Sequence, residues 1–346
     1  MMTNVWIIRL AKIAVFLACC VVALGAYTRL KDAGLGCPDW PGCYGFMAVP
    51  KSEAAVSQAN EAFPHRPLET EKAWAEMVHR YFASSLGFLI LVITFLSVKA
   101  RKTNPNISIK LPVLLLGLVI FQGILGMWTV TLGLFPTVVM GHLLGGFTTL
   151  SLLFLLALIA SGKINPPKLD RANLLFGLTL GGIIILALQI ALGGWTAANY
   201  AAAVCADLPI CQPGWQEQLN TKEAFQFWGH NIHEQGLTDY EYAHHLSGSA
   251  KITIHVAHRI GAIITTVYLS LLLGWILFSF KPAWVKQIAG TAAAFLVLQV
   301  ALGISNVVFG LPLAVAVAHN GVAALLMLSL IWMGYSLYKA KGDHHG

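Results

Sequence analysis

Eight long apolar stretches divide this chain of 346 residues, and they constrain its fold more than any other feature. A helix that crosses a bilayer needs about 20 mostly apolar residues, and each stretch reaches that length. Charged residues make up 11% of the chain, against about 25% in an ordinary soluble domain. The sequence therefore predicts an all-α integral membrane protein with eight transmembrane helices, at residues 5–27, 77–98, 111–130, 137–160, 174–196, 254–280, 284–308 and 312–338.

The composition also excludes other classes of protein. With 57% apolar residues and a mean hydropathy of +0.70, the chain is neither a soluble enzyme nor a disordered chain. An isoelectric point near 9.1 would suit nucleic-acid binding, but the basic residues follow the membrane topology instead. The first apolar stretch is too long for a removable signal and lacks a small-residue cleavage site, so we expect it to remain as a span.

The placement of lysine and arginine predicts the orientation, because short cytoplasmic loops carry an excess of these residues. With the N-terminus inside, the inner segments hold 13 of the 22 basic residues, and only Asp170 and Asp343 oppose them. The outer segments include two loops of about 50 and about 60 residues, which together hold seven basic residues. We therefore expect both termini to be cytoplasmic.

An internal repeat divides the chain into two halves of four spans each, residues 1–165 and 166–346. Four pairs of matching residues share an offset of 168 positions: Gly25 and Gly193, Thr28 and Thr196, Cys37 and Cys205, and Cys43 and Cys211. A Gln-x-x-Leu-Gly motif occurs three times, beginning at Gln122, Gln189 and Gln299. Because each half has an even number of spans, both halves insert in the same orientation. The repeat predicts two pseudo-symmetric four-helix bundles, related by an axis along the membrane normal.

Four histidines belong to this repeat and are expected near the outer ends of their spans: His79, His142, His258 and His319. An ionisable residue within a span is a candidate for a functional site, and each half offers one pair at similar depth. Neutral imidazole binds heme iron, zinc and copper. Zinc and copper usually need further ligands, whereas heme needs two axial ligands and an apolar slot. The pairs therefore indicate heme, with hydrogen bonding to neighbouring backbone as the simpler alternative.

Charged residues beside the histidines have two interpretations each. Arg80 and Arg259 directly follow a histidine; they could pair with heme propionates, or their side chains could extend to the membrane interface. Glu76 precedes His79 by three residues, and the second half has His255 at the matching position. A carboxyl group at the edge of an apolar slot suits acid–base work or stabilisation of a developing positive charge. The alternative is a glutamate near a helix N-terminus, favoured by the helix dipole.

The outer loops contain two equally spaced cysteine pairs, Cys37–Cys43 and Cys205–Cys211. On an oxidising side of the membrane, such pairs predict two short-range disulfides. A redox role in catalysis is the alternative for the first pair. In the second long loop, His230 and His233 have a spacing that could bind a metal, but a solvated loop is the favoured interpretation.

Together these residues resemble the heme A synthase family, which also has a mitochondrial homologue. The resemblance covers nearly the whole chain, and it rests on Gly25-Ala-Tyr-Thr-Arg29, Gly34-Leu-Gly-Cys-Pro-Asp-Trp-Pro-Gly-Cys43, Glu76-Met-Val-His-Arg80, Gly141-His142, His255-Val-Ala-His-Arg259 and His319-Asn320. Each motif is weak alone, but the ordered set on eight spans is specific. The second outer loop, at about 197–253, is more elaborate than expected for the family.

The resemblance implies an oxidoreductase of the bacterial inner membrane that oxidises the C8 methyl group of heme O to a formyl group. It implies that His258 and His319 are the axial ligands of a resident heme b, through which electrons leave. His79 and His142 would flank the substrate heme, and Glu76 matches the family's catalytic carboxylate. The implied partners are heme O, membrane lipid, heme O synthase and cytochrome oxidase assembly factors. No nucleic acid is expected, and a homo-oligomer is left open.

Two other functions remain open at this point. A quinol-linked transmembrane electron carrier of the b-type cytochrome class would also hold hemes between paired histidines. That class usually places hemes near both membrane faces, whereas all four histidines are expected toward the outer face. A transporter with parallel repeats would need polar groups or broken helices near the midplane; the three glutamines there are explained by hydrogen bonds between helices. Heme content discriminates, because an electron carrier would contain heme b alone.

Overall fold

The structure, a computed structural model, describes residues 2–105, 107–228 and 246–341. Within these ranges the secondary structure is helical, apart from an isolated β-bridge between Cys43 and Phe46. Eight of the described helices are long and apolar enough to cross a membrane: α1 (Met2–Leu30), α3 (Thr70–Thr103), α4 (Lys110–Thr131), α5 (Pro136–Ser161), α6 (Ala172–Ala198), α9 (Gly248–Ser279), α10 (Ala283–Val308) and α11 (Leu313–Ala340). The eight predicted spans are confirmed, and they indicate a multi-pass membrane protein.

Two of these helices begin well before the apolar stretch that predicted them. α3 begins at Thr70 rather than residue 77, and α9 begins at Gly248 rather than residue 254. The hydroxyl of Ser247 caps α9 by accepting a hydrogen bond from the amide of Ala250, at 3.1 Å. A hydropathy pattern detects only the part of a helix that contacts lipid, so these polar first turns were not predicted.

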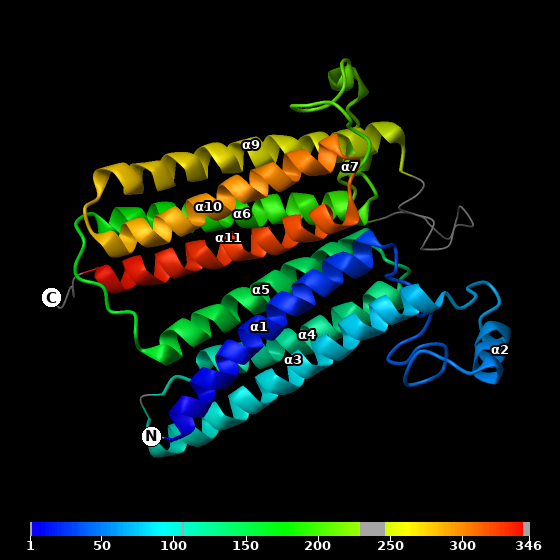
Figure 1. The fold of residues 1–346 in the computed structure, drawn as a ribbon, viewed down its shortest axis with the longest axis horizontal. Helices are drawn as coiled ribbons and strands as arrows, with labels where there is room; N and C mark the ends of the chain where they lie inside the picture. The colour runs from blue at the N-terminus through cyan, green and yellow to red at the C-terminus, as the bar shows by residue number, and fades with distance from the viewer. Residues whose placement is uncertain (1, 106, 229–245, 342–346) are drawn as a thin grey trace.

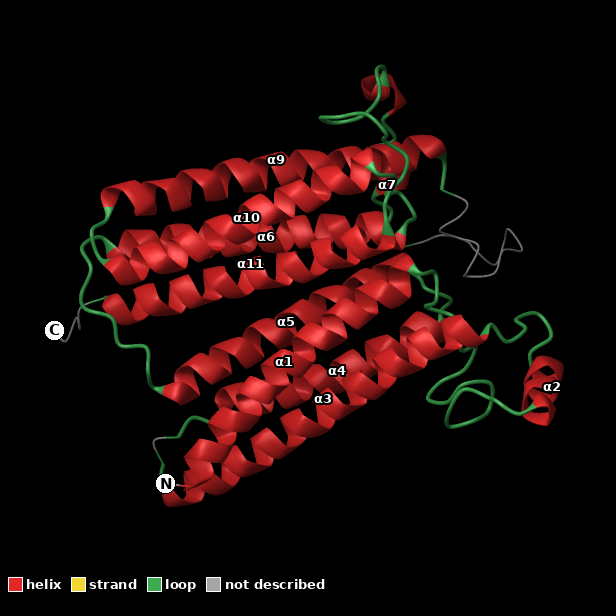
Figure 2. Ribbon diagram, in the orientation of Figure 1, coloured by secondary structure: helices red, strands yellow, loops and turns green. Residues whose placement is uncertain are grey.

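The long helices lie in two groups of four (Figures 1 and 2). In the first group α1 packs against α3 and α5, and α4 packs against α3 and α5. In the second group α6 packs against α9 and α11, and α10 packs against the same two helices. The groups meet where α1 and α5 contact α11 and where α5 contacts α6. α1 begins and α11 ends at the same end of the array, on the left in Figure 1.

The described parts of both long connections lie at the opposite end of the array, on the right in Figure 1. The first carries α2 (Glu53–Ala62), and the second carries η1 (Trp215–Gln218) and α7 (Thr221–Ala224). One continuous cluster of buried apolar side chains runs through both helix groups and includes Leu153, Leu175, Leu269 and Leu326. Large apolar side chains on the outside of the array, such as Phe278 with 90% exposure, are placed to contact lipid.

The internal repeat is also visible in the backbone. Asp32 and Tyr200, which follow α1 and α6, have φ angles of 53° and 52°. Leu134 and Leu311, which follow α4 and α10, have φ angles of 62° and 63°. Positive φ is uncommon for residues other than glycine, so its occurrence at matching positions indicates that the same local turns recur in both halves.

A cluster of polar side chains joins the two helix groups at the end that carries the long connections. Arg29, at the end of α1, donates to the carbonyl of Ala197 in α6 at 2.7 Å. Its guanidinium lies over the ring of Tyr200, 4.0 Å from the centroid. The Tyr200 hydroxyl donates to Asp32 at 2.7 Å. Burial, the largest cause, raises the pKa of Tyr200 to about 12, so this hydroxyl stays protonated at neutral pH.

Candidate functional site

The structure brings the four histidines of the repeat together as two pairs, one in each helix group. His79 on α3 faces His142 on α5, with ring centroids 6.4 Å apart and ring planes at 84°. His258 on α9 and His319 on α11 lie close enough to interact electrostatically. Because each pair draws on two different helices, its geometry depends on how the helices pack.

A glycine on a neighbouring helix gives each imidazole its space. A Cβ atom added to Gly25 would lie 3.0 Å from Cε1 of His79, and one added to Gly193 would lie 3.1 Å from Cε1 of His258. A Cβ atom added to Gly126 would lie 3.4 Å from Cε1 of His142, and one added to Gly303 would lie 3.2 Å from Cε1 of His319. These short distances explain why glycines accompany the histidines in the repeat: a larger residue would push the ring away.

Two of the three Gln-x-x-Leu-Gly motifs place the glutamine side chain against a histidine. Gln189 Nε2 lies 3.0 Å from Nδ1 of His258, and Gln299 Nε2 lies 3.1 Å from Nε2 of His319. These contacts are more specific than the general hydrogen bonds between helices that the sequence predicts for the glutamines. In the motifs that begin at Gln189 and Gln299, the glycine and the glutamine lie against the same histidine. The repetition of the motif is therefore the sequence signal that could identify these glutamines.

The residues present fit heme held between two histidines. An iron atom bound to two imidazole nitrogens at about 2 Å each would separate the ring centroids by about 6 Å, close to the distance between His79 and His142. Nδ1 of His79, His142 and His319 has no hydrogen-bond partner among the described residues, although a backbone carbonyl lies beside each ring. A ligand histidine typically turns its second nitrogen toward such a group. Across the described ranges no three of His, Cys, Asp and Glu gather as a metal site.

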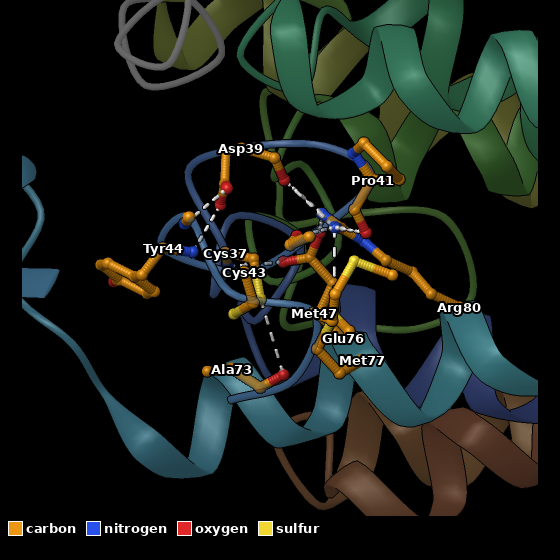
Figure 3. The surroundings of a disulfide bond; sticks show 12 residues. Cys37, Asp39, Pro41, Cys43, Tyr44, Met47, Ala73, Glu76, Met77 and Arg80 are labelled. Atoms are coloured by element: carbon orange, nitrogen blue, oxygen red, sulfur yellow. Dashed lines mark hydrogen bonds and ion pairs between the residues drawn. A yellow bond between two sulfur atoms is a disulfide. The ribbon is translucent and has the colours of Figure 1, made fainter. Parts of the chain in front are cut away.

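Glu76 is buried, with 4% exposure, and points from α3 toward the loop that contains the first cysteine pair (Figure 3). Its Oε2 accepts a hydrogen bond from the amide of Cys37 at 2.9 Å, and its Oε1 forms an ion pair with Arg80. Glu76 is the seventh residue of α3, whereas the helix dipole acts mainly within the first turn. The helix dipole therefore does not account for this carboxylate.

Arg80 connects Glu76 to the loop. Its guanidinium donates to the carbonyls of Asp39 at 3.1 Å and Gly42 at 2.6 Å (Figure 3). The loop lies directly on α3, because a Cβ atom on Gly36 would come within 2.4 Å of the backbone carbon of Lys72. Glu76 is thus fixed by its own helix, by the loop backbone and by a cation.

The second half repeats the arginine but not the carboxylate. Arg259 donates to the carbonyls of Cys205 at 2.6 Å and Ile210 at 2.8 Å, and also to that of Asp207. Its Nε donates to Nε2 of His255 at 3.1 Å. Besides Glu76 and His255 on their own helices, Arg80 and Arg259 contact the backbone of the outer loops. A role of either arginine toward heme propionates stays a prediction.

Both predicted disulfides are confirmed. Cys37–Cys43 and Cys205–Cys211 are bonded, each with its Cα atoms 4.8 Å apart. Among the described cysteines, Cys19 and Cys20 on α1 are free and half-buried. His230 and His233 lie outside the described residues.

These observations define the class of protein: a multi-pass helical membrane protein with a histidine pair in each helix group and a buried glutamate beside one of them. Comparison with known proteins identifies the family. Residues 8–331 match the COX15-CtaA family, described as cytochrome oxidase assembly protein, and the chain belongs to this family.

Several relatives carry a more specific name. The chain is 48% identical over 335 residues to the heme A synthase of Shewanella oneidensis, covering 96% of both chains. It is 26% identical to the heme A synthase of Rhizorhabdus wittichii, over 93% of this chain and 91% of the relative. It is 25% identical to that of Shouchella clausii, over 90% of this chain and 91% of the relative. The recognition of the heme A synthase family from sequence motifs is therefore confirmed.

Proposed function

We propose that this chain is a heme A synthase, an oxidoreductase that converts the C8 methyl group of heme O to a formyl group. The observation that carries this proposal is the combination of two histidine pairs with a buried carboxylate beside only one of them. The name shared by the relatives, including one that is 48% identical, supports it. The chain would lie in the bacterial inner membrane with cytoplasmic termini and two pseudo-symmetric four-helix bundles.

The two histidine pairs would have different occupants. His258 and His319 would hold a resident heme b, which when bound would supply one-electron redox chemistry. His79 and His142 would hold the substrate heme O. The assignment follows the position of Glu76, which shares a face of α3 with His79 because residues three apart lie together on a helix. The other half has a neutral hydrogen-bonded imidazole, His255, at that position.

Glu76 would act on the substrate methyl group as it is oxidised. Removal of two electrons and one proton from this methyl leaves a cationic carbon conjugated to the macrocycle, which a carboxylate stabilises. The same carboxylate can take a proton from the water that attacks this carbon. A second round gives a hydrated aldehyde, which loses water to give the formyl group. Overall, methyl and one water become formyl, four protons and four electrons.

The substitution Glu76→Gln tests this proposal. It keeps the shape of the side chain but removes the charge, so we expect heme A formation to fall by about 10²-fold or more. Heme b should remain bound, and heme O or a hydroxylated intermediate should accumulate. The measurement is acid–acetone extraction of the purified protein, with the hemes separated by chromatography and identified by mass.

A matched control is available on the same helix. Glu71 is exposed and forms an ion pair with Lys31 at 3.0 Å, so Glu71→Gln should leave heme A formation unchanged. Normal heme A yield in the Glu76→Gln variant would remove Glu76 from the mechanism. Heme b alone in the wild-type protein, with heme O supplied by the host, would support the electron-carrier function instead.

A further inference from the structure

The arginine of each half holds its outer loop through two matching contacts, but the charge of the residue beside it on the helix differs. Arg80 donates to the carbonyls of Asp39 and Gly42, and Arg259 donates to those of Asp207 and Ile210, which lie 168 positions later. In the first half Glu76 neutralises the arginine through an ion pair. In the second half the matching residue is His255.

His255 does not neutralise Arg259. Its Nε2 accepts a hydrogen bond from Nε of Arg259, and a ring nitrogen that accepts such a bond carries no proton. Both side chains are buried, with 5% and 7% exposure. Arg259 forms no ion pair with any described residue. The carboxylate of Asp207 interacts with it electrostatically, but this carboxylate is exposed to solvent.

Each arginine donates to the carbonyl of one loop aspartate, so the side chain of that aspartate does not account for the difference. Asp39 and Asp207 occupy matching positions in the two loops. Between these described side chains the charge therefore differs by one unit: the first half has a neutral Glu76–Arg80 pair, and the second has the buried cation Arg259 beside His255. A buried charge acts strongly on its surroundings because the low dielectric of the interior screens it little.

We propose that Arg259, which forms no ion pair with a carboxylate among the described residues because His255 stands where the first half has Glu76, raises the reduction potential of a heme bound to His258 and His319 above that of a heme bound to His79 and His142. A fixed cation stabilises reduced iron relative to oxidised iron, because reduced iron has one positive charge less. Burial and the groups around a heme are means by which proteins tune its reduction potential. The charge difference favours electron flow from the first site to the second. This inference rests on the proposed function, since it requires heme at both pairs.

The substitution His255→Glu tests the inference by recreating the pair found in the first half. At the midpoint potential of the wild-type heme, the ratio of reduced to oxidised heme should fall at least tenfold, which for a one-electron couple is a shift of about 59 mV. His255→Gln is the matched control, because it offers Arg259 a neutral acceptor and should leave the potential unchanged. The potential is measured by redox titration of the heme absorption band in protein from a host that makes no heme O.

Equal potentials in the His255→Glu and His255→Gln variants would overturn the inference. If His255→Glu fails to accumulate, the wild-type protein with heme at both histidine pairs provides a second test. Its two hemes should be reduced in two separate steps. His142→Ala should abolish the step at lower potential, and loss of the step at higher potential in this variant would contradict the inference. Absence of heme from the wild-type protein would instead overturn the proposed function.

Discussion

At the scale of single residues, Gly193 determines where the imidazole of His258 can lie. A Cβ atom at Gly193 would stand 3.1 Å from Cε1 of that ring, so Gly193→Ala should displace the ring by a few tenths of an ångström. Overpacking of this kind costs about 1–3 kcal/mol. We expect a clear loss of bound heme b in the purified variant, measured by pyridine hemochrome absorbance against protein concentration.

The same helix supplies the control for this substitution. Gly177 also lies on α6, and a Cβ atom there would have nothing within 4 Å. Gly177→Ala should therefore keep its full heme content and gain slightly in helix stability, since alanine is the better helix former. Equal heme content in the two variants would show that the close approach of Gly193 to His258 does not matter for binding.

At the scale of elements, the packing of the first disulfide loop on α3 positions Glu76. Gly36 leaves no room for a side chain, because a Cβ atom there would lie 2.5 Å from the carbonyl oxygen of Lys72. Gly36→Ala should lift the loop from the helix and break the hydrogen bond between Cys37 and Glu76. We expect the Cys37–Cys43 disulfide to be reduced faster by a water-soluble phosphine, measured by maleimide labelling.

The second disulfide is an internal control in this experiment. Val204 occupies the position that matches Gly36, so the second loop accommodates a side chain where the first does not. Labelling of Cys205 and Cys211 should therefore be the same in wild type and variant. Faster labelling at both loops would indicate general destabilisation, and unchanged labelling at Cys37 would contradict the role given to Gly36.

The sequence predicts the long helices well and their polar ends poorly. A run of apolar residues predicts each membrane-spanning segment, because a helix that crosses the bilayer needs about 20 such residues in a row. The first turns of α3, from Thr70 to Ala75, have no such pattern and depend on contact with the loop. α2 and α7 were not predicted either, since short helices in polar connections are stabilised mainly by tertiary packing.

In the candidate site, too, features that depend on nearby residues of the chain could be predicted, and contacts that depend on tertiary packing could not. The histidines, Glu76 and the cysteine pairs follow from spacing and repetition along the chain. The partners of Arg80 and Arg259 could not be predicted, because backbone carbonyls carry no sequence signal. The contact between Gln189 and His258 required knowledge of how α6 packs on α9.

At the scale of the whole molecule, the cluster of Arg29, Asp32 and Tyr200 links the two helix groups. Tyr200→Phe removes the hydroxyl that donates to Asp32 and should cost about 1 kcal/mol of stability. Arg29→Gln removes both the cation over the Tyr200 ring and the charged donor to Ala197, and should cost about 2 kcal/mol. Unfolding by increasing SDS in mixed micelles, followed by circular dichroism, measures both losses.

A double-mutant cycle then shows whether these residues act as one unit. Because Arg29 and Tyr200 are in contact, the double variant should lose less stability than the sum of the single variants, by about 0.5 kcal/mol or more. Tyr268→Phe is the control: its hydroxyl donates to the carbonyl of Leu178 at 2.8 Å, within the second helix group. Combined with Arg29→Gln, this change should be additive. Additivity in both cycles would mean that Arg29 and the Tyr200 hydroxyl contribute independently, and it would contradict their action as one unit.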